Sequence, residues 1–393
     1  MKKKICVITS SRADYGLLKP LIDGINNCDA MELQLIVTGS HLVSEFGYTY
    51  KEIENDGIKI NAKIEILLSS DTPIAIAKSM GLTLISFSET YNILKPDIIF
   101  VMGDRYEIFS AVAAAHVSLL PVAHISGGEV TEGVIDDAFR HSITKMSHLH
   151  FTSIEEYRDR VIQLGENPKT VFNVGEIGVE NIKDYELITK NELENDLGFK
   201  LNKRNLLITF HPVTLEHNTS KIQFGNLLYV LSKQKNTKLI FTRANSDMFG
   251  QIINQMIKDY VKIYSQSSLE VISLGRLKYL SLLQFVDAVV GNSSSGIIEA
   301  PSFQIGTINI GDRQQGRLKA ESVIDCPPTR EGIKLALKNL YSSGFQKDLK
   351  HIKNPYEKEN GIKIMLKATQ EYLDNKKELK KGFFDLSFDQ NKK

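Results

Sequence analysis

Residues 287–317, DAVVGNSSSGIIEAPSFQIGTINIGDRQQGR, contain a short apolar run, a serine-rich turn and a second apolar run. The first run, residues 288–290, stops at Gly291, and three serines at 293–295 precede apolar residues at helical spacing. This order predicts a strand, a tight polar turn and the N-terminus of a helix. A second strand is expected at residues 306–310, before a loop that carries two arginines. We therefore expect a parallel α/β unit with a ligand crevice at this turn.

The turn offers groups that bind phosphate. Backbone N–H groups and small hydroxyls at the start of a helix attract anions, so Ser293 and Ser294 could donate to a phosphate or pyrophosphate. Glu299 could accept hydroxyls from a neighbouring ribose, and Arg313 would bring a guanidinium to the same crevice. The alternative is that the serines only cap a helix that is followed by a surface loop.

The length and the charge balance suit a two-domain protein that binds its ligands locally. A chain of 393 residues exceeds one ordinary core, and its 42% of hydrophobic residues can fill two. Lys and Arg total 48 and Asp and Glu total 47, which gives a net charge of +1. With no overall field to attract nucleic acid or an anionic membrane, we expect neither as a partner.

The cysteines and the apolar runs favour a cytoplasmic location. Cys6, Cys28 and Cys326 lack the C-x-x-C spacing, which argues against a disulfide framework or a zinc site. The apolar run after the basic N-terminus is too short for a signal peptide. No apolar run reaches about 18 residues, so we expect no membrane span.

Expected strands and helices alternate in two series. The strands of the first series are expected at residues 5–8, 32–37, 98–102 and 121–125, with helices at 17–25 and 111–119. The second series has expected strands at residues 206–210, 238–241 and 271–274. The junction falls in residues 171–182, so we expect α/β domains at 1–175 and 176–360, followed by a charged helix and tail at 361–393. No G-x-G-x-x-G follows the first strand, which argues against a nicotinamide cofactor.

Acidic residues and histidines gather after the expected strands. Asp104 directly follows an apolar strand, so its carboxylate should be partly desolvated; the alternative is a structural pair with Arg105 or another arginine. Asp136 and the neighbouring Asp137 could face the same cleft or cap the following helix. Carboxylates that face a histidine such as His211 across a cleft can move protons on and off a substrate. His148 and His150 have no third ligand in register, so we expect no metal there.

Eight short segments together resemble the hydrolysing UDP-N-acetylglucosamine 2-epimerases of sialic acid biosynthesis. They keep the family's order from residue 11 to residue 317, and each alone is only modestly specific. The segments are SRADYG (11–16), VTGSHL (37–42), GDRYE (103–107), AHISGGE (123–129), IDDAFRHSITKMSHLH (135–150), FHPVT (210–214), GNSSSGIIE (291–299) and IGDRQQGR (310–317).

The resemblance implies two Rossmann-like domains that face each other across a cleft, as in GT-B glycosyltransferases, with the C-terminal helix packed back on the first domain. It also implies a reaction in which UDP leaves C1 as the C2 proton is removed. Water then adds to the resulting glycal with inversion at C2 and releases N-acetylmannosamine. The route needs neither a metal nor a nicotinamide cofactor, and a homodimer or homotetramer is expected.

The matching positions also carry expected roles. The resemblance gives the catalytic acid, base and leaving-group roles to Asp104, Asp136 and His211. It assigns the UDP-sugar to eight residues: Arg12, His41, Arg105, Asn245, Ser293, Ser294, Glu299 and Arg313.

The chain departs from the resembling family at three places. Many relatives have Glu where this chain has Ser126, which leaves the group that handles the C2 proton open, with Glu129 and Glu132 as substitutes. Gly16 stands where animal enzymes have Ser. The loop between Glu129 and Asp136 is one residue longer, near C4 and C6 of the sugar. Three alternatives therefore stay open: UDP-N,N'-diacetylbacillosamine as substrate, a GT-B glycosyltransferase, and a UDP-sugar sensor without catalysis.

Overall fold

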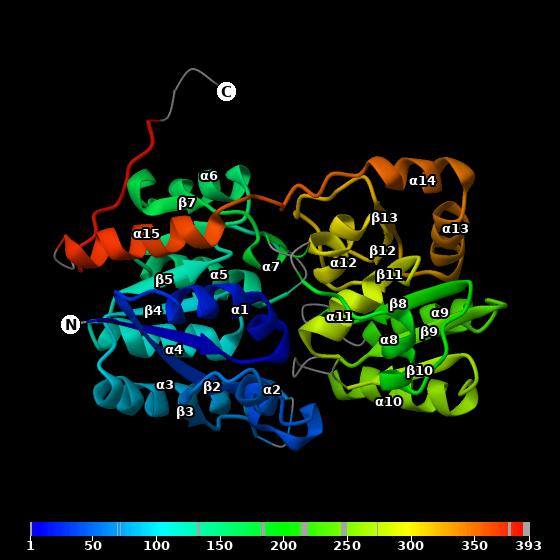
Figure 1. Cartoon of the computed structure of the whole chain (residues 1–393), viewed down its shortest axis with the longest axis horizontal. Helices are drawn as coiled ribbons and strands as arrows, with labels where there is room; N and C mark the ends of the chain where they lie inside the picture. Colours follow the sequence, from blue (N-terminus) through cyan, green and yellow to red (C-terminus); the bar gives the residue numbers. More distant parts are fainter. Residues whose placement is uncertain are drawn as a thin grey trace.

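Two parallel α/β domains lie side by side in the computed structural model of the chain (Figure 1). The structure describes residues 2–68, 70, 72–131, 134–180, 182, 185–213, 219–244, 250–272, 274–375 and 379–387. Within these residues, no helix is both long enough and apolar enough to cross a bilayer.

The first domain is built on a seven-stranded sheet of described residues in the order β3-β2-β1-β4-β5-β6-β7, with every neighbouring pair parallel. Its strands are β1 (Lys3–Thr9), β2 (Met31–Thr38), β3 (Ile60–Ile64), β4 (Ile98–Met102), β5 (Val122–Ile125), β6 (Leu149–Thr152) and β7 (Val171–Asn173). Its helices are α1 (Arg12–Asn26), α2 (Tyr50–Asn55), α3 (Pro73–Leu94), α4 (Tyr106–Val117), α5 (Asp136–Met146), α6 (Glu155–Gln163) and α7 (Ile177–Glu180).

The second domain repeats this plan with six strands in the order β10-β9-β8-β11-β12-β13, again all parallel. Its strands are β8 (Arg204–Thr209), β9 (Thr237–Thr242), β10 (Ser268–Val271), β11 (Ala288–Gly291), β12 (Gly306–Ile310) and β13 (Val323–Cys326). Its helices are α8 (Lys190–Leu197), α9 (Ser220–Leu231), α10 (Gly250–Ile263), α11 (Gly275–Leu283), α12 (Ser295–Ile298), α13 (Arg330–Leu340) and α14 (Ser343–Asp348).

Both faces of each sheet are covered, which explains why the strands read as continuous apolar runs. In β1, Ile5 and Val7 pack on one side with α1, while Cys6 and Ile8 pack on the other side with α3 and α4. In β8, Leu206 packs with α9 and α10, whereas Leu207 joins the layer that contains α8 and α11. The predicted two-domain α/β fold is confirmed.

The C-terminal helix α15 (Gly361–Asp374) returns to the first domain. In Figure 1 its orange-red ribbon lies on the domain that contains the N-terminus. Met365, Ala368 and Leu373 enter the same core as α1, and Lys3 Nζ donates to the carbonyl oxygen of Leu373 (3.4 Å). The expected return of this helix is confirmed, although it ends at Asp374 and not near residue 380.

Several element boundaries differ from the sequence predictions. The strand expected at residues 271–274 is β10, which ends at Val271, because Gly275 already begins α11. The helix expected from residue 111 begins at Tyr106. Strands β3 and β13 were not predicted; both are edge strands whose residues are mostly half-exposed, so they lack a long apolar run.

Candidate active site

The order of the strands directs both domains toward one cleft. In each sheet the chain order reverses beside the first strand, between β1 and β4 and between β8 and β11. Loops at the carboxyl ends of such neighbouring strands diverge and leave a crevice for ligands. Two cavities lie there and share the wall formed by Ala13, Leu17, Ser294, Ile298 and Arg313.

The first cavity, called here the nucleotide cavity, lies between α1 and the turn after β11. Its polar wall consists of Arg12, Thr209, His211, Thr242, Arg243, Arg276, Tyr279, Ser293, Ser294, Ser295, Glu299 and Arg313. Arg12 reaches this position because Ser11 and Asp14 form a capping box that starts α1 at Arg12. Its Nη1 donates to the carbonyl oxygen of Ile272 in the second domain (3.0 Å).

Gly291 and Asn292 arrange the turn that the sequence singled out. Gly291 has a φ of 141°, and a Cβ there would collide with the carbonyl oxygen of Thr209, so only glycine fits. Asn292 Oδ1 accepts from the backbone of His211 (2.7 Å), and its carbonyl oxygen accepts from Arg313 Nη1 (3.1 Å). One buried asparagine therefore holds His211 and Arg313 in place on the cavity wall.

The helix after the serines is shorter than expected. It is the four-residue α12 and continues into a 3-10 helix at Ala300–Phe303, since Pro301 cannot extend an α-helix. So short a helix adds little dipole. Ser293, Ser294 and Ser295 all line the cavity, and Ser295 is also hydrogen-bonded to Tyr279. The hydroxyls and guanidiniums, more than the helix, are the groups on this wall that can pair with an anion.

Glu299 forms an ion pair that the sequence did not predict. It follows α12 and contacts Arg276, which also donates to the carbonyl oxygen of Gly178. Both charged side chains line the nucleotide cavity, so Glu299 can accept ligand hydroxyls while Arg276 holds it. A Cβ at Gly16 would lie 3.1 Å from Arg276 Cδ, so the glycine at this position gives Arg276 its space.

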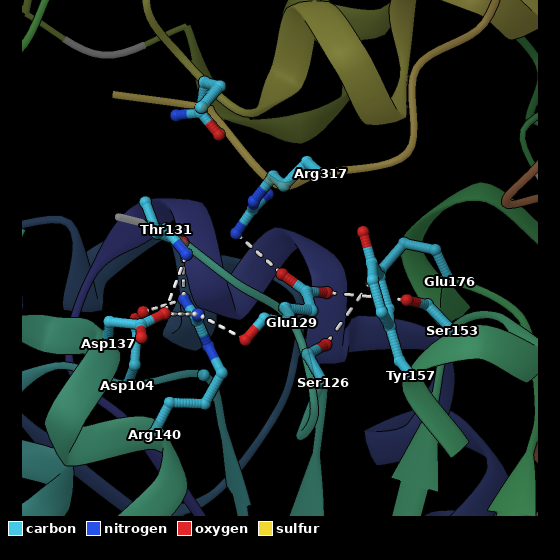
Figure 2. A network of polar contacts seen from close by, with 12 residues as sticks. Asp104, Ser126, Glu129, Thr131, Asp137, Arg140, Ser153, Tyr157, Glu176 and Arg317 are labelled. Atoms are coloured by element: carbon cyan, nitrogen blue, oxygen red, sulfur yellow. Dashed lines mark hydrogen bonds and ion pairs between the residues drawn. The ribbon is translucent and has the colours of Figure 1, made fainter. Parts of the chain in front are cut away.

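The second cavity, called here the acidic cavity, contains most of the predicted catalytic carboxylates. Asp104, Glu129 and Asp136 line it, together with Arg105, Ser126, Glu176 and Arg317. Figure 2 shows how a buried arginine, Arg140, organises one side of it. Arg140 contacts Asp104 and also donates to Asp137 Oδ1 (3.1 Å) and to the carbonyl oxygen of Glu129 (3.0 Å).

Asp104 therefore has a structural partner and a cavity-facing position together. The partner is Arg140, and not Arg105, whose Nε contacts Glu107 Oε1 (2.6 Å). The side chain of Asp104 is 20% exposed, so it remains accessible from the cavity. Asp104 is therefore ion-paired and still in reach of a ligand in the cavity.

The two aspartates at the start of α5 have different surroundings. Asp137 accepts from the backbone of Thr131 (2.7 Å) and from Arg140, while Asp136 lines the acidic cavity. Burial raises the pKa of Asp137, but hydrogen bonds from His141 and Thr131 outweigh it and lower the pKa overall. Neither aspartate is the N-cap, because Ile135 occupies that position. The capping alternative is therefore wrong, and Asp137 instead holds the loop before α5.

Glu129 joins the two domains. Its Oε2 lies 2.6 Å from Arg317 Nη2, and the side chains are only 4% and 9% exposed (Figure 2). Ser153 donates to its other oxygen, Oε1 (3.4 Å). The sequence placed Arg317 near the crevice but did not predict this pair. Glu129 is thus held as an ion-paired carboxylate beside the cavity.

Glu176 is a cavity residue that sequence reasoning missed. It is 2% exposed, lines the acidic cavity and accepts from Ser126 Oγ at 3.5 Å. Burial, with the nearby Glu129 and Glu299, raises its pKa to about 8, and Arg317 and the backbone N–H of Gly178 only partly oppose this. The signal in the sequence is a lone Glu after Gly175 in the domain junction, which carries no motif.

One predicted site residue, His41, is not brought to the two cavities. His41 is fully buried, with Nε2 3.0 Å from Thr9 Oγ1 and Nδ1 2.8 Å from Thr49 Oγ1. Burial lowers the pKa of His41 to about 4, so a neutral ring that supports the loop after β2 explains it better than substrate contact. Asn245 and the substitute candidate Glu132 lie outside the described residues.

The described residues contain no group of three or more His, Cys, Asp or Glu side chains arranged to hold a metal ion. Nε2 of the buried His150 lies 3.0 Å from Oε2 of the buried Glu166, which also pairs with the partly exposed Lys145 and Lys381. These contacts tie the C-terminal segment to the first domain.

Two Rossmann-like domains around a cleft define the GT-B-like class of α/β proteins. A family model described as UDP-N-acetylglucosamine 2-epimerase matches residues 24–368. The chain belongs to this family.

Individual relatives agree with this assignment. The GDP/UDP-N,N'-diacetylbacillosamine 2-epimerase (hydrolyzing) of Campylobacter jejuni is 46% identical over 82% of this chain and 84% of its own length. The polysialic acid biosynthesis protein P7 of Escherichia coli is 39% identical over 98% of both chains. The crystal structure of the Neisseria meningitidis UDP-GlcNAc 2-epimerase bound to UDP-GlcNAc superposes with a TM-score of 0.79. It is 16% identical and covers 94% of this chain and 100% of its own.

Proposed function

We propose that this protein is a hydrolysing 2-epimerase of a UDP-2-acetamido sugar. The main observation in support of this proposal is that a cavity rich in hydroxyls and arginines shares a wall with a cavity rich in carboxylates. A nucleoside diphosphate sugar with its nucleotide part in the first cavity would extend the attached sugar into the second. The printed name of the Campylobacter relative, a hydrolysing 2-epimerase, supports the same reaction.

The nucleotide cavity would hold UDP. Ser293, Ser294, Arg12 and Arg313 are proposed to bind the diphosphate, because guanidiniums and hydroxyls pair with phosphate oxygens. Glu299 is proposed to accept the ribose hydroxyls, and Asn245 is kept as a candidate from the sequence. His211 would stabilise the negative charge on the departing phosphate.

The acidic cavity would carry the chemistry. Asp104, Asp136 and Glu129 are proposed as its acid–base groups, with Arg105 as a substrate-binding residue. Removal of the C2 proton and departure of UDP would give a glycal, and addition of water with inversion at C2 would release the free 2-epimer.

Two sugars are candidate substrates. The sequence analysis put UDP-N-acetylglucosamine first, but the relative at 46% identity is named for N,N'-diacetylbacillosamine. We therefore favour UDP-N,N'-diacetylbacillosamine. UDP-N-acetylglucosamine is the second candidate, since the 39% identical relative belongs to polysialic acid biosynthesis by name. The sugars differ at C4 and C6, so kcat/KM on each decides between them, with about a tenfold or larger preference expected.

The same incubation separates the other candidate functions. With UDP-sugar alone, a 2-epimerase releases UDP and the free 2-epimer. A GT-B glycosyltransferase would need an acceptor, and a sensor would only bind. Absence of turnover on both UDP-sugars would refute the proposed function.

We also expect a cytoplasmic homodimer or homotetramer. Apolar side chains are exposed at Ile74, Ile85 and Ile93 on α3, at Val117 at the end of α4 and at Leu119 after it, and α3 contacts α4. Exposed apolar side chains that gather on one surface often mark an interface. Light scattering after gel filtration measures the mass, and a monomer would contradict this expectation.

A further inference from the structure

We propose that Glu176 is the catalytic acid that delivers the proton to C2 of the glycal. The inference rests on the proposed function and deepens it, because it assigns a group to the step that Ser126 left open. The position, the free oxygen and the protonation of this side chain support it independently.

The position of Glu176 comes from the domain junction. It follows Gly175 directly before α7, and its backbone N–H donates to the carbonyl oxygen of Tyr356 (2.9 Å). Ser126, which stands where many relatives have Glu, donates to Glu176 Oε2 (3.5 Å). A carboxyl group is therefore present beside residue 126, but it is supplied by another part of the chain.

The second oxygen of Glu176, Oε1, is a buried acceptor in a side chain that lines the acidic cavity. Among the described residues, no group hydrogen-bonds to Oε1, although the side chain is 98% buried and lines the acidic cavity. A buried polar atom without a partner is costly, so it usually marks a place where a ligand or water binds. In Figure 2, Asp104 and Glu176 lie on either side of Glu129.

Burial, together with the neighbouring carboxylates, favours the protonated form of this carboxyl by raising its pKa. Burial contributes most to the raised pKa of about 8, and Glu129 and Glu299 raise it further. Arg317 opposes them, but its nearest carboxylate is Glu129 (2.6 Å). Glu129 is ion-paired with Arg317, whereas the raised pKa of Glu176 favours its neutral form near pH 7. Acid–base catalysis uses this kind of division, with one carboxyl group ionised and the other protonated.

The step balances as follows. The O–H bond of Glu176 breaks and a C2–H bond forms with the electron pair of the C1–C2 double bond, which leaves positive charge at C1 and the ring oxygen. Water forms the new C1–O bond and gives its proton to an ionised carboxylate of the cavity. Glu176 then takes a proton from solvent. Inversion at C2 needs a donor on the face opposite the base, and Glu176 lies across Glu129 from Asp104, one of the proposed acid–base groups (Figure 2).

The test compares Glu176→Gln with the wild type and with Glu186→Gln, a control at an exposed glutamate ten residues further along. Each protein is incubated with whichever of the two UDP-sugars the wild type turns over. UDP, glycal and free 2-epimer are followed by NMR in deuterated water. In Glu176→Gln we expect the first UDP to leave within about tenfold of the wild-type rate. The glycal should accumulate, and the 2-epimer should form about 100-fold more slowly or worse.

The outcomes separate the two proposals. If the wild type releases no UDP and no 2-epimer, the proposed function fails. If the wild type is active and Glu176→Gln forms 2-epimer within about tenfold of its rate, the assignment of Glu176 is overturned. Equal loss of UDP release and 2-epimer would overturn it as well, because a donor to the glycal acts only after UDP has left.

Folding and pH provide a second readout. Melting temperature and UDP affinity of Glu176→Gln should match those of the control. If either value differs from that of the control, Glu176→Asp is the second variant, because it keeps a carboxyl group on a shorter side chain. It should still accumulate some glycal, and a wild-type ratio of glycal to free 2-epimer would overturn the proposal. In the wild type, hydration of added glycal should fall as the pH rises through about 8, because the donor loses its proton. This fall of the hydration rate near pH 8 should be absent in Glu176→Gln.

Discussion

Replacing Arg317 by Met should destabilise the protein through Glu129. The substitution keeps the length of an apolar stem but removes the charge that lies 2.6 Å from Glu129 Oε2. Because both side chains are at least nine-tenths buried, Glu129 would be left as an uncompensated charge. Breaking such a pair costs about 3–5 kcal/mol.

This cost converts to a shift in melting temperature. The entropy of unfolding is about 2.1 cal/mol/K per residue, which gives about 0.8 kcal/mol/K for this chain. Arg317→Met should therefore lower the melting temperature by about 4–6 °C. The measurement is calorimetry of the purified proteins in the same buffer.

A double-mutant cycle isolates the pair. Glu129→Gln alone leaves Arg317 unpaired and should also destabilise, whereas Glu129→Gln with Arg317→Met removes both charges and should recover part of the loss. We expect a coupling of about 2 kcal/mol. Additive effects, or a shift below about 1 °C for Arg317→Met, would contradict the role of the pair. Arg204→Met, an exposed arginine elsewhere in the second domain, is the matched control.

Three further predictions concern the site and the C-terminal segment. Asp104→Asn should lower kcat at least about 100-fold with UDP affinity within twofold, and a near-normal rate would remove Asp104 from the chemistry. Glu299→Ala should weaken UDP binding in calorimetric titration by about 10-fold to 100-fold, since it removes a charged acceptor and unpairs Arg276; unchanged affinity would count against it. Burial raises the pKa of Glu166, but the contacts with His150, Lys145 and Lys381 lower it to about 2. Its stabilising effect should therefore be complete above pH 4.5 and be lost as the pH falls toward 2, and Glu166→Gln should flatten this part of the stability profile.

The fold was predictable where strands are buried on both faces. The runs at β1, β4, β8 and β11 are continuous because each packs between two helical layers. The edge strands β3 and β13 were missed because a half-exposed strand carries little apolar signal. Tertiary packing, more than local pattern, forms them.

The site was predictable where a residue follows a buried strand. Asp104, His211 and Ser293 all lie there, and all line one of the two cavities. His41 also follows a strand, yet its ring turns into the core and is held by Thr9 and Thr49. The period of a strand does not fix the direction of the side chain in the loop after it.

The residues that sequence reasoning missed are those defined by distant partners. Arg140, Arg276 and Glu176 acquire their roles through contacts with residues 23 or more positions away. No spacing rule connects them, because these contacts exist only after each domain has folded and has brought separate loops together. Glu176 in particular stands outside every segment that resembled the family.

The most direct measurement of the proposed function is proton NMR of the wild-type protein with UDP-N,N'-diacetylbacillosamine and, separately, with UDP-N-acetylglucosamine in deuterated water. We predict release of UDP and of a free sugar that is inverted at C2 and carries one deuterium there. A product that keeps the C2 configuration or the C2 proton, or no product without an added acceptor, would contradict the assignment.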